Sequence, residues 1–143
     1  MKLRSYLAAV GAAGLVGLGG YALPALAGTS WTTHTLKFIS VTDKTLVLSS
    51  TTAAQQDTDV IKSGKVIGFD MLYLTFNAKA STGSGTFAFC THGGMLMGTL
   101  RLTKTGATGA VTGGTGKYAG ATGSVIATTI TKTRTAVTLK YWT

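Results

Sequence analysis

Threonine alternates with apolar residues along almost the whole chain beyond residue 28, and this pattern restricts the fold most. The chain of 143 residues contains 27 threonines, and all of them lie after that point. They are interleaved with Val, Ile, Leu, Phe and Tyr, which is typical of the pleated, half-buried surface of a β-sheet. No stretch keeps an apolar period near 3.6, and the single proline, Pro24, precedes the threonine-rich part. The sequence therefore predicts an all-β protein.

Eight short segments have the composition of strands and are separated by turn-forming residues. The turns are expected at Thr42–Lys44, Lys62–Gly64, Ser81–Gly83, His92–Gly94 and Lys104–Gly106. The strands are expected at Trp31–Ser40, Thr45–Ser50, Val66–Phe76, Gly85–Thr91, Met95–Thr103, Ala107–Thr112, Gly123–Thr131 and Thr135–Trp142. Hairpin-length links at near-regular spacing indicate an antiparallel sandwich or barrel. The polar segment Thr51–Asp59 is expected to be a mobile loop at one mouth.

Residues 1–27 have the organisation of a secretory signal peptide. Lys2 and Arg4 precede an apolar run from Leu7 to Gly20, and Ala25–Ala27 gives the small-x-small pattern that a signal peptidase cuts. The run is shorter than the ~20 apolar residues of a membrane-spanning helix and is rich in glycine. We therefore expect cleavage, a secreted extracellular protein with one domain at 28–143, and no stable membrane insertion.

The charge balance is strongly basic, with a formal net charge of +9, four acidic residues and no glutamate. A surface of this kind attracts polyanions non-specifically. The lysines are scattered and are not interleaved with aromatic residues, so no nucleic-acid-binding module is expected. The single cysteine, Cys90, cannot form an internal disulfide, and the fold must depend on its hydrophobic core.

The alternation also predicts which residues point inward. In Met95–Thr103 the even positions are apolar, and in the last strand the odd positions are apolar, so these faces are expected inside. Phe87 and Phe89 are expected on the inward face of their strand, so Cys90 is expected to point outward.

The segment Val66–Phe76 is apolar on both faces, and a strand with this pattern is buried on both faces. In a small antiparallel barrel, only a neighbouring subunit can cover the outer face. We therefore predict a homo-oligomer whose interface lies near Phe69, Met71, Met95 and Met97.

The run Val111–Gly123, VTGGTGKYAGATG, raises the question of a phosphate-binding loop. Its spacing does not fit, because Val111 stands where a glycine is required and Tyr118 stands where Ser or Thr follows the lysine. Gly114–Ala119 matches the dinucleotide-binding letters, but a strand follows it where that motif needs a helix. We interpret the run as a turn whose glycines adopt positive φ or pass close beneath an aromatic such as Tyr118.

The segment AVTGGTGKYAGATGSV, Ala110–Val125, resembles the signature of the dirigent and allene oxide cyclase barrel superfamily. VIGFDMLYLTFN, Val66–Asn77, resembles the preceding core strand of that family more loosely. The resemblance covers residues 28–143 and is greatest to the small secreted bacterial members. It implies an eight-stranded antiparallel closed barrel of calycin type, usually a trimer, with a cavity of ligand size.

In this superfamily the barrel holds a small, mostly apolar intermediate while the intermediate cyclises or couples. The resemblance therefore implies an isomerase- or cyclase-type activity that acts by confinement and orientation, without a cofactor. The chain departs from the plant members, because it has no glutamate and because Ala119 and Thr122 stand where dirigent proteins carry arginines. Neither plant activity is expected to transfer directly.

Asp70 is the candidate catalytic residue, since a carboxyl among apolar neighbours has a raised pKa and can act as acid or base. The alternative is a carboxylate that is hydrogen-bonded at a strand distortion beside Gly68. The expected ligand-binding residues are Gly68, Leu72, Phe76, Gly98 and Tyr141. No metal site is expected, because the chain lacks ligand spacing in the candidate set of His34, His92, Cys90, Asp57 and Asp59.

Two functions from different classes remain open. The first is a secreted dirigent-like barrel that binds a small apolar molecule in its lumen and steers its cyclisation or coupling, or only carries it. The second is a non-enzymatic structural or adhesive domain whose basic surface contacts polyanions. The volume inside the barrel distinguishes them.

Overall fold

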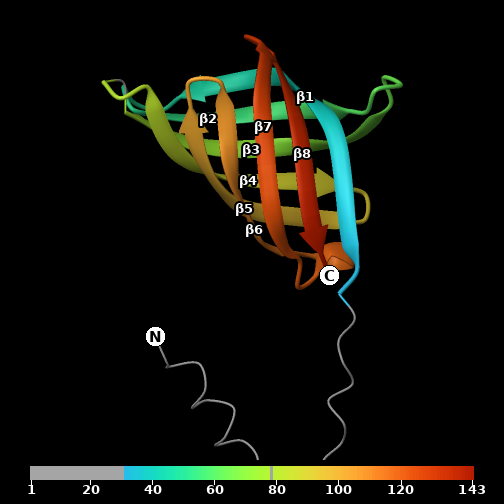
Figure 1. Cartoon of the computed structure of the whole chain (residues 1–143). Coiled ribbons are helices and arrows are strands. Elements are labelled where there is room, and N and C mark those ends of the chain that lie inside the picture. Colours follow the sequence, from blue (N-terminus) through green and yellow to red (C-terminus); the bar gives the residue numbers. More distant parts are fainter. Residues whose placement is uncertain (1–30, 78) are drawn as a thin grey trace, which may run out of the picture. The chain divides into compact units, whose positions relative to one another are not determined.

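The computed structural model describes residues 31–77 and 79–143, and there the chain forms a closed antiparallel barrel of eight strands in sequence order (Figure 1). The strands are β1 (Thr33–Val47), β2 (Thr52–Val60), β3 (Val66–Asn77), β4 (Thr82–Thr91), β5 (Gly94–Thr103), β6 (Gly106–Gly114), β7 (Thr122–Thr131) and β8 (Arg134–Trp142). A short 3₁₀ turn, η1 (Gly116–Tyr118), joins β6 to β7. The expected signal peptide lies outside the described residues. Within them, no helix has the length and apolar character needed to cross a membrane.

Pairing between β1 and β8 closes the barrel. The register joins Thr33 to Trp142 and continues to Val41 opposite Arg134. In Figure 1 the blue β1 therefore lies beside the red β8, although they are the first and last strands of the domain. Every strand has two hydrogen-bonded neighbours, so the barrel exposes no free sheet edge. The predicted fold class is confirmed.

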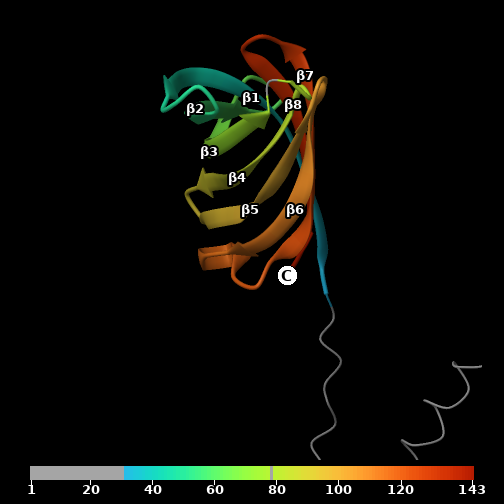
Figure 2. The same cartoon turned by 90° about the vertical axis from the view of Figure 1, so that its left-hand side faces the viewer.

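The segment Thr51–Asp59 is not a loop, and that expectation was wrong. It forms β2, which pairs with β1 on one side and β3 on the other (Figure 2). The expected turn around Asp43 is instead a β-bulge, where the register shifts between Thr42 and Lys44. The two segments that were expected as the first two strands are therefore one long strand, β1. Thr58 Oγ1 donates a 2.6 Å hydrogen bond to the Asp43 carboxylate beside this bulge.

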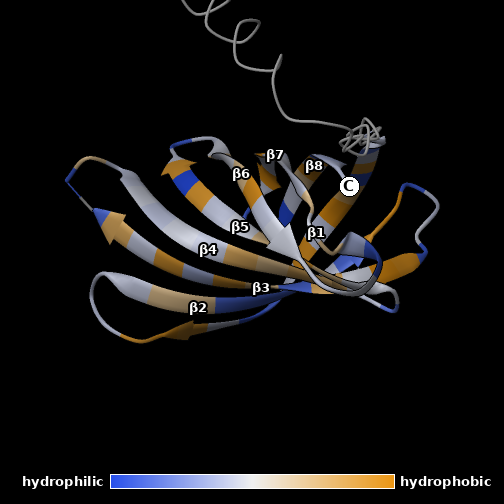
Figure 3. Cartoon of the chain, turned by 90° about the horizontal axis from the view of Figure 1, so that it is seen from below, coloured by the Kyte–Doolittle hydropathy of each residue, from blue (hydrophilic) through white to orange (hydrophobic). Residues whose placement is uncertain are grey.

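Side chains alternate between the inside and the outside of the wall, and Figure 3 shows the resulting bands of apolar and polar residues along the strands. The inward faces predicted for β5 and β8 are confirmed, because Leu96 and Leu139 are buried while Thr99 and Lys140 are exposed. Phe89 is also buried, as expected for the inward face of β4. The period-2 pattern alone therefore placed these side chains correctly.

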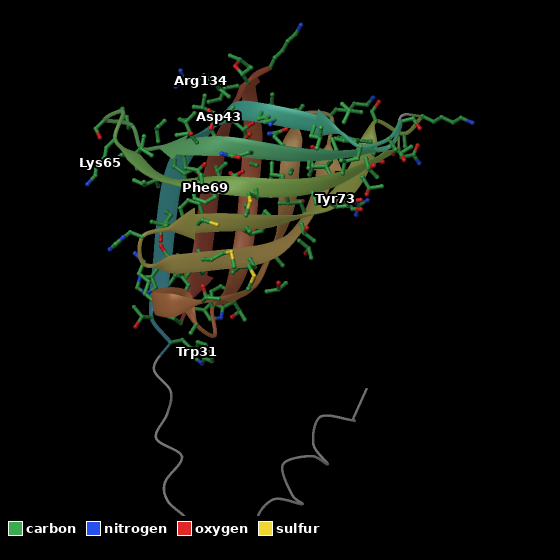
Figure 4. The ribbon with its side chains drawn as sticks, turned by 180° about the vertical axis from the view of Figure 1, so that it is seen from behind. Trp31, Asp43, Lys65, Phe69, Tyr73 and Arg134 are labelled. Atoms are coloured by element: carbon green, nitrogen blue, oxygen red, sulfur yellow. The ribbon has the colours of Figure 1, made fainter. Side chains whose placement is uncertain are left out.

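The outer face of β3 carries large apolar side chains. Phe69, Met71 and Tyr73 are 42%, 48% and 50% exposed. Figure 4 views this side of the barrel, with Phe69 and Tyr73 labelled along β3. The strand is thus apolar on both faces, and one of these faces is open to solvent in the single chain.

The glycine-rich run is a turn that seals one end of the barrel. Gly116 and Gly120 have φ of +59° and +76°, which only glycine adopts freely. The backbone of Gly114 passes against Tyr118, as predicted. The Lys117 ammonium lies 4.9 Å from the centroid of the Tyr118 ring. This lysine therefore makes a cation–π contact within the turn. Buried Tyr118 packs edge-on against Tyr141 at 5.6 Å between ring centroids.

Candidate functional site

The barrel encloses a cavity of about 510 Å³. Its wall is mostly apolar and receives side chains from all eight strands, among them Leu72, Leu74, Phe87, Leu100, Val125 and Val137. These residues face inward because each occupies the apolar phase of its strand's alternation. A cavity of this volume and lining fits one small, mostly apolar molecule.

The residues that line the cavity extend to one end of the barrel. Asn77, Ser81, Thr103 and Gly106 line it, and they flank the β3–β4 and β5–β6 turns. At the opposite end none of the residues of η1 line the cavity, because Tyr118 and the core residues around it fill the space. The barrel therefore has a mouth at the end where the odd-numbered strands finish and a packed floor at the opposite end.

Three aspartates gather on the inward face of β2 and β3. Asp57 and Asp59 lie two residues apart on β2, and Asp70 lies opposite Asp57 in the β2–β3 register. All three side chains are buried, with Asp59 fully inaccessible. Asp57 and Asp70 also line the cavity. The acidic cluster, as we call Asp57, Asp59 and Asp70, is thus part of the cavity wall and of the packing behind it.

Neutral polar groups hold Asp57 in place. Gln55 Nε2 lies 2.9 and 2.8 Å from the two carboxylate oxygens of Asp57 and 3.2 Å from Thr42 Oγ1. Ser40 Oγ lies 2.8 Å from Asp57 Oδ2 and 3.2 Å from Asp70 Oδ2. Its single proton donates to one of these oxygens at a time. Asp57 is therefore the best-satisfied carboxylate of the three.

The other two carboxyls have strongly raised pKa values. Burial, followed by the charge of Asp57, raises the pKa of Asp70 to about 7, while the hydrogen bond from Ser40 opposes this rise. Burial, followed by the charge of Asp70, raises the pKa of Asp59 to about 9. At neutral pH Asp59 thus holds a proton and Asp70 is divided between its two forms. The proton on Asp59 lets that carboxyl donate toward Asp70, which two carboxylates cannot do.

Some acceptors of the cluster remain without a partner. When the carboxyls are unprotonated, both oxygens of Asp59 and Oδ1 of Asp70 have no hydrogen-bond donor among residues 31–77 and 79–143. Buried polar atoms are almost always paired, and an exception points to strain or to a missing partner. These three oxygens are inaccessible, so their partner lies within the acidic cluster, where the proton of Asp59 can supply a hydrogen bond.

The structure brings part of the predicted site together. Asp70, Leu72 and Phe76 all lie in the cavity wall on β3. Gly68 and Gly98 are not among its lining residues, because the rings of Phe89 and Phe87 lie over their backbones and fill the space. Aromatic side chains commonly pack over glycines in neighbouring strands.

Tyr141, the last of the predicted ligand-binding residues, does not line the cavity either. It lies in the packed floor, between His34 and Tyr118. Contact of any of these residues with a ligand stays a prediction.

Sequence reasoning missed Ser40, Gln55, Asp57 and Asp59 as members of the site. Three of these four residues lie in the segment that was expected to be a loop. The signal was the spacing of Asp57 and Asp59, which places them on one face as soon as the segment is a strand. Together with Asp70 on the neighbouring strand they form the acidic cluster, although no arrangement suited to holding a metal ion occurs among the described residues.

Cys90 lies on the outer face, as predicted, and opposite Phe69 in the β3–β4 register. Burial raises the pKa of its thiol, so the thiol is protonated at neutral pH. His92 is exposed in the turn between β4 and β5. Neither residue lines the cavity.

The fold is similar to that of two solved structures, one of which is a dirigent protein. One is described as pyocyanin demethylase, with a TM-score of 0.65 and 17% identity over 76% of this chain and 99% of that one. The other is the pterocarpan synthase dirigent protein GePTS1, with a TM-score of 0.54 and 17% identity over 78% of this chain and 84% of that one. No family model and no curated protein sequence matches the chain. At this identity the likeness concerns the fold.

Proposed function

We propose that this protein is a dirigent-like barrel that binds one small apolar molecule in its cavity and steers the cyclisation or coupling of that molecule. The observation that carries the proposal is a mostly apolar cavity of about 510 Å³ with a carboxyl of pKa about 7 in its wall. The apolar wall holds the molecule in one conformation and excludes water, which favours an intramolecular reaction.

Asp70 is the proposed acid–base residue. A group whose pKa lies near the working pH can both give and take a proton, because both of its forms are present. Asp59 lies behind it, and its proton can replace the one that Asp70 gives up. The two structural neighbours are named as a demethylase and a synthase, so enzymes occur on this fold.

The binding part of the proposal is tested by native mass spectrometry of the protein purified from its own secretion medium. The expected result is a retained small molecule that dissociates when the barrel is unfolded. The same spectrum gives the number of subunits. A protein that carries no molecule, and that takes up none from an extract of the same medium, would contradict the proposal.

The catalytic part is tested with the molecule so identified. Asp70→Asn keeps the size of the side chain and removes its acid–base capacity, so turnover at a saturating concentration of the molecule should fall by roughly 10²–10⁴-fold. Unchanged turnover would remove Asp70 from the mechanism. Binding without any reaction in the parent protein would assign the barrel as a carrier.

We propose further that the protein acts outside the cell after removal of residues 1–27. The N-terminal sequence of the secreted protein tests this directly, since it should begin close to Gly28. A protein that keeps Met1 and stays with the cells would contradict it.

A second candidate function rests on the charge of the exterior. Among the described residues every lysine and arginine is exposed, whereas three of the four aspartates are buried. The surface is therefore more basic than the composition suggests, which favours an adhesive domain that contacts anionic polymers. Cosedimentation with such a polymer should be lost between ~0.1 M and ~1 M salt, because the screening length falls from ~10 Å to ~3 Å.

A further inference from the structure

The cavity has a negative interior inside a positive exterior. Asp57 and Asp70 are the charged residues among those that line it, and no lysine, arginine or histidine of the described part of the chain does so. All the basic side chains of that part are exposed on the outer surface or in the turns. The electrostatic environment of a bound molecule is therefore set by the acidic cluster.

The neutral donors near the cluster are already engaged. Gln55 and Ser40 both donate hydrogen bonds to the carboxylate of Asp57. The Ser40 hydroxyl also lies 3.2 Å from Oδ2 of Asp70. Asp70 Oδ1 is inaccessible, and its donor is the proton that Asp59 holds. Asp70 as a whole is 7% exposed and lines the cavity. A carboxylate oxygen accepts more than one hydrogen bond. A molecule in the cavity therefore reaches this carboxyl at Oδ2, where the Ser40 hydroxyl is the one donor among the described residues.

We propose that the molecule held in this cavity is a cation with an apolar body, whose protonated nitrogen donates a hydrogen bond to Asp70 while the body packs against the apolar wall. The inference rests on the proposed function, since it names the class of ligand for the same cavity. A charge-assisted hydrogen bond to a buried carboxylate is about twice as strong as a neutral one. A cation also relieves the repulsion between Asp57 and Asp70, which a neutral or anionic ligand does not.

The shape of the cavity fits this class. Asp70 lies seven residues from Asn77, the β3 residue at the mouth, which is a path of roughly 23 Å along the strand. The wall along this path is formed by Leu72, Leu74 and Phe76. A linear or flat apolar body is therefore accommodated between the charged group and the mouth.

The test compares three probes that share one apolar body and differ in charge. Calorimetric titration of the full chain at neutral pH uses n-octylamine, n-octanol and n-octanoate. The amine should bind at least tenfold more tightly than the alcohol, which corresponds to about 1.4 kcal/mol. Octanoate should bind more weakly than the alcohol, because it places a third negative charge beside Asp57 and Asp70.

A pair of variants assigns the preference to the cavity. Asp70→Asn should lower the affinity for octylamine to that for octanol and leave octanol unchanged. Asp43→Asn is the matched control, because Asp43 is the exposed aspartate of the chain and should have no effect on either probe. If Asp70→Asn does not fold, the three-probe series on the parent protein still decides the question.

The outcomes separate the two proposals. Equal binding of amine and alcohol, stronger binding of octanoate, or an amine affinity that Asp70→Asn does not reduce would overturn the cationic ligand and leave an apolar binding barrel. Failure of all three probes to bind would instead count against the proposed function, and the inference would fall with it.

Discussion

At the residue scale, burial decides what the aspartates of this protein do. Asp43 is exposed beside a bulge, whereas Asp59 and Asp70 are enclosed by the barrel, and their pKa values rise to about 9 and about 7. Such shifts are linked to stability, because the unfolded chain ionises these groups at a lower pH than the folded one. The ordinary value for each is 3.8, so the unfolded state loses its protons first as the pH rises.

The first prediction concerns Asp59 and pH. Between about pH 5 and about pH 9 the unfolded state binds fewer protons than the native state. The free energy of unfolding should therefore fall as the pH rises through this range, by on the order of a few kcal/mol. Asp59→Asn should reduce that loss, because the variant has nothing to ionise at this position. Asp70, Asp57 and, with the smallest effect, Asp43 are the charged groups that act on Asp59, and they remain in the variant. Urea denaturation at the two pH values measures the effect.

Asp43→Asn serves as the control in the same experiment and should follow the parent protein. An Asp59→Asn variant that loses as much stability as the parent between the two pH values would show that another group governs the pH dependence.

The second prediction concerns two glycines. A Cβ at Gly98 would meet the backbone oxygen of Ala110 and the ring of Phe87, so Gly98→Ala should destabilise the barrel by roughly 2–4 kcal/mol. Gly113 has open space at the same point, and Gly113→Ala should stay within roughly 0.5 kcal/mol of the parent. Thermal and urea denaturation compare them. Equal effects of the two substitutions would mean that the tight packing of β5 against β4 and β6 is not what Gly98 provides.

At the element scale, β2 shows why a polar segment can be a wall strand. Its inward face carries Ala53, Gln55, Asp57 and Asp59, so the usual rule of apolar-in and polar-out is broken on one strand. The strand is stabilised by pairing with β1 and β3 and by the hydrogen bonds of Gln55. The polar residues of β2 therefore form part of the candidate site, and they do not indicate a loop.

The third prediction follows from this assignment. Backbone amides of β2 should exchange with deuterium about as slowly as those of β3, because strands on both sides protect them. The β2–β3 turn at residues 61–65 is the internal reference and should exchange much faster. Exchange of residues 53–59 at the rate of that turn would restore the loop interpretation.

The elements also show how far the sequence alone could lead. The all-β class, the inward faces of β5 and β8 and the glycine turn followed from period and turn chemistry. The count of eight strands agreed only because two errors cancelled: β1 was divided in two and β2 was expected to be a loop. The junction of the first two predicted strands did not, because a bulge at Asp43 has the same composition as a turn. The acidic cluster did not follow either, because its members come from two strands whose register no local pattern specifies.

At the scale of the whole molecule, the outer face of the closed sheet carries an apolar patch on β3 and β5. Phe69, Met71 and Tyr73 on β3 are exposed, and Met95 and Met97 lie across β4 from them on β5. Isolated exposed apolar residues are ordinary, but a contiguous patch marks an interaction site. We propose that this patch is the interface of a homotrimer.

The fourth prediction tests that proposal. At ~10 µM the protein should sediment as a trimer, and Met71→Lys should convert it to a monomer by placing an unpaired charge in the buried interface. Ile126→Lys is the matched control, since Ile126 is 55% exposed on β7 and should leave the trimer intact. A parent protein that sediments as a monomer would contradict the proposed interface.

The packed floor around Tyr118 has a consequence for the rate of any reaction in the barrel. The lining of the cavity extends to the opposite end, beside the β3–β4 and β5–β6 turns, so we expect reactant and product to use the same mouth. The next molecule is admitted only after the previous one has departed, so turnover cannot exceed the rate of that departure. Substitutions that loosen these turns should therefore accelerate release even though they lie far from Asp70.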